Sequence, residues 1–177
     1  MDYKEIISSC YCGDGGEKLK KAEALISSYG TDLLTKEETI QKQLSIVKGA
    51  VLALDTQMIA MELGKTCIAC AAAPGGGCCS AYMGHENNDA LLLMMNILAG
   101  VDVRLVRDDE IECCFLAETG CILLFKPIFC LNYLCSRIQK GSSEKQLRLL
   151  EQETGTVLTA QGQLELLIIG FLQSQNR

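Results

Sequence analysis

The stretch TKEETIQKQLSIVKGAVLALDTQMIAMELG, residues 35–64, contains a long and regular apolar pattern. Thr35 and Glu38 have capping-box spacing, which satisfies two free backbone donors at the start of a helix. Apolar residues then recur three or four positions apart, as one face of an α-helix requires: Ile40, Leu44, Val47, Val51, Leu54, Met58 and Met61. Gly64 follows as a C-terminal stop. The stretch predicts one long helix whose apolar seam packs inside a helical bundle, with a dimer interface over residues 40–61 as the alternative.

Further helices are expected on both sides of this stretch. Upstream, GEKLKKAEALISSYG predicts a shorter amphipathic helix that ends at Gly30. Downstream, Asn87 or Asn88 can cap NDALLLMMNILAG, which is so apolar that it predicts a buried helix ending at Gly100.

The C-terminal region is also expected to be helical. Ser143 and Gln146 occupy capping-box positions at the start of one helix. Thr154-Gly155 is expected to separate that helix from a final apolar one.

Between the helices the apolar period changes. VDVRLV (101–106) and IECCFL (111–116) flank a plausible turn at residues 107–110, and together they predict a short β-hairpin. We therefore expect a single, mainly α domain over residues 1–177. It would be a helical bundle, with helical elements at 14–64, 87–100 and 136–175 and a small cysteine-rich insert, containing the hairpin, within 67–135.

Composition and charge exclude several classes of protein. The 177 residues are 49% hydrophobic and 21% charged, as in ordinary globular domains. The net charge is −6 and the Lys and Arg residues are scattered, which argues against a nucleic-acid partner. The N-terminus lacks the features of a secretory signal, and the runs ALLLMMNILAG and LELLIIGFL are shorter than the roughly 20 residues that cross a bilayer. These features predict a cytoplasmic protein without a membrane segment.

The chain has eleven cysteines. Cytoplasmic thiols are kept mostly reduced, and an odd number leaves at least one cysteine unpaired, so a disulfide framework explains them poorly. Cys67-x-x-Cys70 has the spacing of a metal-ligand pair, in which both sulfurs turn toward one ion. The small residues that follow let the backbone fold back and bring Cys78 and Cys79 to the same neighbourhood. Ligation of a metal or cluster is the leading interpretation; buried free thiols are the alternative.

The later cysteines complete a pattern. Cys113-Cys114-Phe-Leu, Gly-Cys121, Lys126-Pro127-x-x-Cys130 and Cys135 follow the first group. Over residues 67–135 the chain resembles the YkgJ-type cysteine-cluster family, described as zinc- or iron-chelating and including a flagellin lysine methylase. It differs from the family's pattern in its longer gap before the double cysteine, in Cys114 at a proline position and in Lys126 at an arginine position.

This resemblance implies a set of metal ligands. Aligning Phe115-Leu116 with the family motif makes Cys113 the ligand and Cys114 an extra residue. The eight candidates are Cys67, Cys70, Cys78, Cys79, Cys113, Cys121, Cys130 and Cys135. Eight thiolates suffice for two four-thiolate sites, or for one site with spare thiols.

The bound group is expected to be a [4Fe-4S] cluster, with Zn²⁺ as the close alternative. Apolar neighbours surround the cysteines, as a cluster prefers, although they suit a structural zinc site almost as well. The predicted function is a metal-binding protein that serves a redox or electron-transfer partner. A zinc-binding interaction module and a cluster-dependent enzyme, related to methyltransferases, are the alternatives. No serine, histidine and carboxylate set supports hydrolysis.

Three remaining residues have less distinctive surroundings. His85, the single histidine, lies in Gly-His-Glu-Asn-Asn, which is typical of an exposed loop, with metal ligation as the alternative. Cys10 and Cys12 are expected to be incidental thiols, with further ligands or a redox pair as the alternatives.

Overall fold

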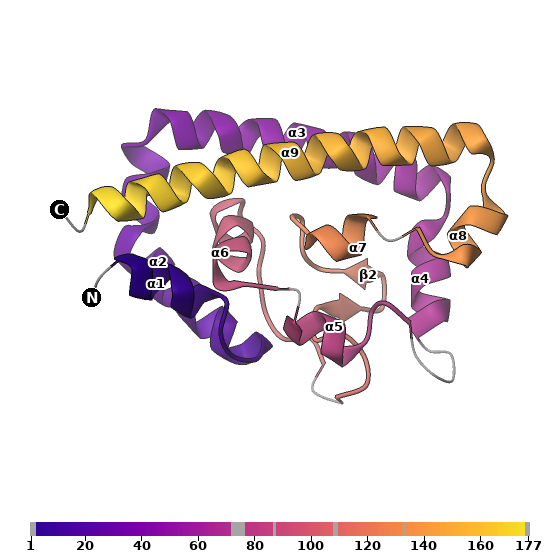
Figure 1. The fold of residues 1–177 in the computed structure, drawn as a ribbon, viewed down its shortest axis with the longest axis horizontal. Coiled ribbons are helices and arrows are strands. Elements are labelled where there is room, and N and C mark those ends of the chain that lie inside the picture. Colours follow the sequence, from indigo (N-terminus) through magenta and orange to yellow (C-terminus); the bar gives the residue numbers. More distant parts are fainter. Residues whose placement is uncertain (1–2, 72–76, 87, 108–109, 133, 176–177) are drawn as a thin grey trace.

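The computed structural model describes residues 3–71, 77–86, 88–107, 110–132 and 134–175. Two long helices, α3 (Glu38–Ala60) and α9 (Glu144–Ser174), lie side by side along the long axis of the molecule (Figure 1). The shorter elements form a second layer beneath them, with α1 (Tyr3–Cys10) and α2 (Gly15–Thr35) at one end. The predicted fold, mainly α with one small hairpin, is confirmed.

The seam of α3 lies in the core of this single chain. Its residues from Ile40 to Leu54 are almost completely buried, and Met58 packs against the core from its edge. Two glutamines add polar contacts to α9: Gln43 Nε2 donates to Ala160 O at 3.0 Å, and Gln57 Nε2 donates to Gln146 O at 3.1 Å. The earlier residue of α3, Gln43, contacts the later part of α9, and the later residue, Gln57, contacts the beginning of α9. The two helices are therefore antiparallel. The seam therefore packs as the bundle interpretation predicted.

Both predicted ends of this helix were wrong. Thr35 is the last residue of α2, and its Oγ1 donates to Thr31 O instead of capping α3. The cap position of α3 is Glu37, which makes no side-chain capping bond. The helix stops at Ala60, before Glu62 with its φ of 52°, rather than at Gly64.

The C-terminal helix is continuous where a break was expected. Ser143 and Gln146 form the predicted capping box. The helix then runs through Thr154 and Gly155, because buried residues continue at helical spacing on both sides, with Leu150 before them and Val157 after them. A glycine inside a helix costs about 1 kcal/mol, which the burial of such side chains exceeds.

The same reasoning applies to α2, which continues past the predicted end at Gly30 to Thr35 and buries Leu33 completely. Its start carries a capping box formed by Asp14 and Glu17.

The buried helix α6 (Ala90–Leu98) is present where the sequence predicted it. Its cap is Asp89, whose side chain accepts from Leu92 N; Asn88 is not the cap, and Asn87 lies outside the described residues. Gly100 follows the helix with a φ of 88°, a conformation that favours glycine.

The cysteine-rich segment contains more helix than expected. It includes α4 (Leu63–Ala71), α5 (Ala81–Glu86) and α7 (Ile128–Asn132), and α8 (Ser136–Gly141) follows it. The predicted strands at 101–106 and 111–116 were wrong, because the described hairpin pairs β1 (Leu116–Ala117) with β2 (Gly120–Cys121). One hydrogen bond, Val106 N to Cys114 O at 2.7 Å, links the two predicted segments; part of their turn, residues 108–109, lies outside the described residues.

The helix α9 by itself is long and apolar enough to span a membrane, with a mean hydropathy of 1.3 in its most apolar window. Core helices of soluble proteins meet the same criterion, and α9 packs one face against α3.

The seam provides a direct test of the bundle. Leu44→Glu with Val51→Glu is expected to unfold the protein, because two carboxylates would enter an apolar core. Leu52→Glu with Ile59→Glu is the matched control, since these α3 side chains are 71% and 76% exposed. Circular dichroism and thermal melting measure both variants. A folded Leu44→Glu, Val51→Glu protein would show that the seam is not core.

Candidate metal centre

Five cysteines surround one small cavity. Cys67 and Cys70 lie three residues apart on α4, and this spacing places them on one face of the helix. Cys78, Cys130 and Cys135 complete the thiol lining, and the cavity between them has a volume of about 50 Å³. Apolar side chains form most of the remaining wall: Met58, Leu63, Leu131, Leu134, Ile138 and Leu150. Cysteines from two distant regions of the sequence, residues 67–78 and 130–135, thus meet here.

A backbone pairing brings the two double cysteines together. Ser80 and Glu112 form an isolated antiparallel bridge, and Cys113 N donates to Cys79 O at 2.8 Å. The dipeptides Cys78-Cys79 and Cys113-Cys114 therefore lie directly opposite each other. The sequence did not indicate this pairing, because no strand-like pattern surrounds Ser80.

The remaining two candidates lie beside these dipeptides. Cys121 ends β2, and Cys130 on α7 interacts electrostatically with the thiols of Cys121, Cys113 and Cys78. Lys126 places a positive charge near this side of the cluster, and its Nζ lies 3.8 Å from Asp55 Oδ1 on α3. All eight predicted ligands therefore lie in one region of the fold.

Crowding of thiols changes their pKa values. Burial and the neighbouring cysteines raise the pKa of Cys67 to about 11. Part of Cys130 reaches solvent, but desolvation by the surrounding protein raises the pKa of its thiol to about 12, with contributions from the adjacent thiols that exceed the opposing effect of Lys126. Within the pair Cys78 and Cys79, a thiol hydrogen bond lowers the pKa of Cys78 and raises that of Cys79. Such thiols ionise together only when a cation compensates their charge, which is what a bound metal does.

A buried asparagine holds the segment between Cys121 and Cys130. Asn96 on α6 is completely buried, and its Oδ1 accepts from Leu124 N at 2.8 Å and Phe125 N at 3.0 Å. Its Nδ2 donates to Phe125 O at 2.9 Å and to Leu92 O at 2.9 Å. Sequence reasoning missed Asn96, although a polar residue inside such an apolar helix is a signal that could have identified it.

Two glycines allow thiols to approach the backbone closely. A Cβ atom at Gly84 would lie 2.9 Å from Cys113 Sγ and 3.3 Å from Cys113 Cα. A Cβ atom at Gly77 would lie 2.7 Å from Cys70 Sγ and 3.3 Å from the Cys70 carbonyl carbon. No larger residue fits at either position without moving the cysteine, so both glycines help to position the thiols.

Of the less distinctive residues, Cys10 and Cys12 lie outside this region. Cys10, the last residue of α1, is buried in the core, and Cys12 just after it is exposed; α1 and α4 lie on opposite sides of the molecule (Figure 1). His85 is half-buried in α5 instead of lying in an exposed loop, and its Nδ1 accepts from Gly15 N at 2.9 Å. Through this hydrogen bond His85 contacts the first turn of α2.

Cys114 differs from its neighbour in its surroundings. It is buried and lines a second cavity with His85, next to Gly15. Because residues 113–114 are not in a strand, they do not alternate between two faces as a strand would require. The interaction of the two adjacent thiols lowers the pKa of Cys113 to about 7 and raises that of Cys114.

The thiols of the predicted ligands lie in one region, but they are not close enough together to coordinate a single metal ion as they stand. Within the described residues, no three His, Cys, Asp or Glu side chains are close enough together to hold one metal ion. A cysteine sulfur moves by a few ångströms when its side-chain torsion changes rotamer, so the backbone positions permit closer arrangements.

Comparison with known proteins gives no relative for this chain: no protein-family model, curated protein or solved structure matches it. The resemblance to the YkgJ-type family therefore still depends on the cysteine motifs alone.

The glycine at position 84 allows a test of the thiol arrangement. Gly84→Ala is expected to destabilise the protein by about 1–3 kcal/mol, because the new methyl group overlaps Cys113. Gly64→Ala is the control: this α4 glycine has no atom within 4 Å of an added Cβ, so the change should be neutral or slightly stabilising. Chemical denaturation measures both. Equal stability of the two variants would contradict the close contact at Gly84.

Proposed function

We propose that the chain is a cytoplasmic metal-binding protein that holds one or two four-thiolate iron–sulfur clusters and serves a redox or electron-transfer partner. The observation that carries the proposal is the convergence of Cys67, Cys70, Cys78, Cys130 and Cys135 on one apolar-walled cavity. Packing alone does not require five thiols from three separate segments around one cavity.

The apolar surroundings of the thiols favour a cluster, with a single zinc ion as the close alternative. Zinc draws four sulfurs to about 2.3 Å from one centre, which demands close sulfur atoms. A cubane cluster distributes its four thiolates over separate iron atoms, so its ligands lie farther apart. The apolar wall of the thiol-lined cavity is the kind of surrounding that a cluster prefers. When bound, such a cluster would supply one-electron transfer.

The surface near the cysteines supports a partner that exchanges electrons. Cys121 and Cys130 reach solvent at one edge of the cluster of thiols. Beside Cys130, the side chains of Ile128 and Phe129 are each 57% exposed. A partner protein that covers these apolar side chains would come within a short distance of the thiols.

Purification without oxygen followed by metal and sulfide analysis tests this function. We expect iron and acid-labile sulfide in equal amounts and a brown absorption band that dithionite bleaches reversibly. Zinc in a colourless protein would contradict the redox function and support the zinc-binding module. A protein that binds neither metal under reducing conditions would contradict metal binding altogether.

Two adjacent cysteines test the assignment of ligands. Cys113→Ser is expected to lose metal, because a serine hydroxyl is a poor replacement for a thiolate and Cys113 lies beside Cys121 and Cys130. Cys114→Ser should keep near-normal metal content, since Cys114 faces Gly15 and the second cavity. Metal-to-protein ratios of both variants decide the matter. Depletion in Cys114→Ser with full loading of Cys113→Ser would reverse the assignment.

A further inference from the structure

The two long helices present an apolar outer face. The shorter elements lie beneath α3 and α9, so the upper side of both helices faces outward (Figure 1). On α3 the seam points into the core, and the opposite side of the helix carries Ile46, Leu52 and Ile59, each more than half exposed. Leu166 on α9 is 70% exposed. Single exposed aliphatic residues are ordinary in soluble proteins, but several on two adjacent helices mark an interaction surface.

This outer face carries little charge, although the whole chain has a net charge of −6. Residues 45–60 of α3 and 152–174 of α9 contain four charged side chains. Three of them, Asp55, Glu153 and Glu165, are partly buried at helical positions next to the core, and Lys48 is exposed at the edge of the face. Two acidic chains repel each other less through this face than through the rest of their surface.

The α9 half of the face is hollow, whereas the α3 half carries projecting side chains. A shallow groove of about 530 Å³ lies on α9. Small and polar residues line it, and a Cβ atom at Gly155 would have no other atom within 4 Å. The groove residues are Gln152, Gly155, Thr156, Thr159, Ala160 and Gln163. The face therefore contains both the aliphatic projections and a groove that has space for them.

A face with projections on one helix and a groove on the other is complementary to a second copy of itself. With a two-fold axis parallel to the helices, α3 of one chain lies over α9 of the other chain, and the reverse contact is identical. Two layers of two helices then form a four-helix bundle.

The area of the face matches what a stable dimer needs. The 23 residues of α3 extend over about 35 Å, and two adjacent helices are about 20 Å wide. The face therefore measures about 700 Å² on each chain, and a dimer would bury about 1,400 Å² in total. Stable protein–protein interfaces bury about 1,200–2,000 Å².

We propose that the outer face of α3 and α9 is a homodimer interface, in which the exposed aliphatic side chains of α3 in each chain pack into the α9 groove of the other. This face lies opposite the buried seam, so association leaves the core of each chain intact. None of its residues lines the cysteine cavity, so the association of the chains and their metal content can be measured independently.

Sedimentation equilibrium of the full chain tests the proposal, with a reducing agent present to prevent disulfide cross-links. We expect a dimer with a Kd below about 10 μM. Leu52→Glu with Ile59→Glu should give a folded monomer, with the Kd raised at least about 100-fold, because the carboxylates would enter an apolar contact. Leu105→Glu with Ile111→Glu is the control and should stay dimeric, since it adds the same charge at exposed aliphatic residues outside the two long helices. A monomeric unaltered chain, or a dimeric Leu52→Glu, Ile59→Glu variant, overturns the proposal.

A charge-swap experiment tests the pairing of α3 with α9. Thr156→Lys with Thr159→Lys places two ammonium groups in the groove and should also give a folded monomer. An equimolar mixture with the Leu52→Glu, Ile59→Glu variant should restore a dimer that contains one chain of each kind. One of its two α3–α9 contacts is then unaltered, and the other brings glutamates opposite lysines. A mixture that stays monomeric overturns the pairing.

A lipid surface is the other partner that this face must be tested against, because α9 has the length and hydropathy of a membrane span. The probe is cosedimentation with phosphatidylcholine vesicles. We expect the unaltered chain to stay in the supernatant. Binding to the vesicles that the Leu52→Glu, Ile59→Glu variant loses would assign the face to a membrane and overturn the proposal.

Discussion

The amide of Asn96 is the contact on which the arrangement of the cysteine-rich segment depends. It sits in the middle of a fully apolar helix and makes four hydrogen bonds, three of them to the backbone of Leu124 and Phe125. Each such bond contributes about 1 kcal/mol net, but leaving the buried partners unsatisfied costs about 1–3 kcal/mol per group. The combined cost of leaving several such groups unsatisfied approaches the total free energy of unfolding of a domain, about 5–15 kcal/mol. Asn96 therefore makes the buried polar contacts that hold Leu124 and Phe125, in the chain between Cys121 and Cys130, at the core.

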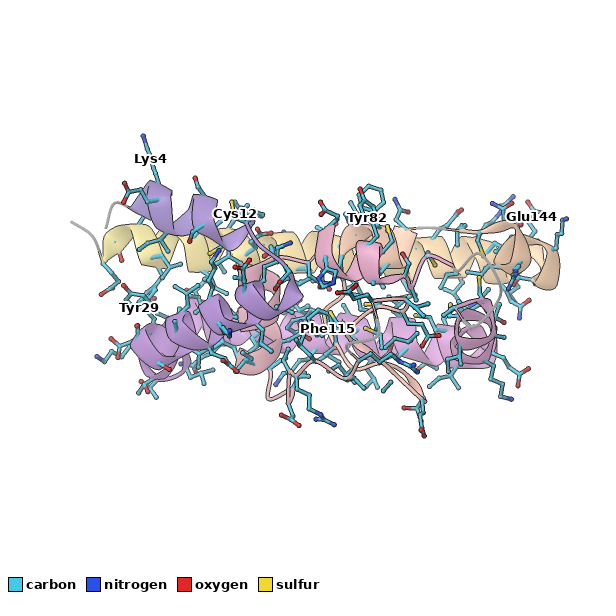
Figure 2. All side chains as sticks on the ribbon, turned by 90° about the horizontal axis from the view of Figure 1, so that it is seen from below. Lys4, Cys12, Tyr29, Tyr82, Phe115 and Glu144 are labelled. Carbon is cyan, nitrogen blue, oxygen red and sulfur yellow. The ribbon has the colours of Figure 1, made fainter. Side chains whose placement is uncertain are left out.

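The two layers of the molecule differ in what stabilises them. The long helices α3 and α9 bury continuous apolar seams against each other and against α2, so their stability comes from packing. The cysteine-rich layer has two-residue strands and short helices, which are marginal on their own. Phe115 and Phe125 anchor this layer in the core, as the central position of Phe115 shows (Figure 2). Between these anchors most of the thiols are only partly buried around a small cavity, so a bound metal would supply contacts that apolar side chains supply elsewhere.

The sequence predicted those features that repeat at a regular spacing, and failed where tertiary packing decided. The α3 seam, the buried helix α6 and the Ser143 capping box were all visible as patterns. Gly30 and Gly155 were expected to end helices, but burial of the residues that follow outweighs the cost of one glycine. The grouping of the cysteines followed from their spacing, while the bridge at Ser80 and the role of Asn96 depend on contacts between distant segments. The spacing of residues along the sequence gives no information about such contacts.

The placement of Cys67 and Cys70 on a helix changes how a bound cluster would be tuned. In a loop, a Cys-x-x-Cys pair presents free backbone N–H groups to its thiolates, and those hydrogen bonds raise the potential of a cluster. In α4 most of these N–H groups already donate to carbonyl oxygens of the same helix. Lys126 is then the cation whose charge acts on the Cys121 and Cys130 side. Its carbonyl accepts a hydrogen bond from Gln161 Nε2 on α9, which ties this residue to the long helix. The segment that Asn96 fixes at Leu124 and Phe125 thus continues directly into the residue whose positive charge opposes the raised pKa values of these two thiols.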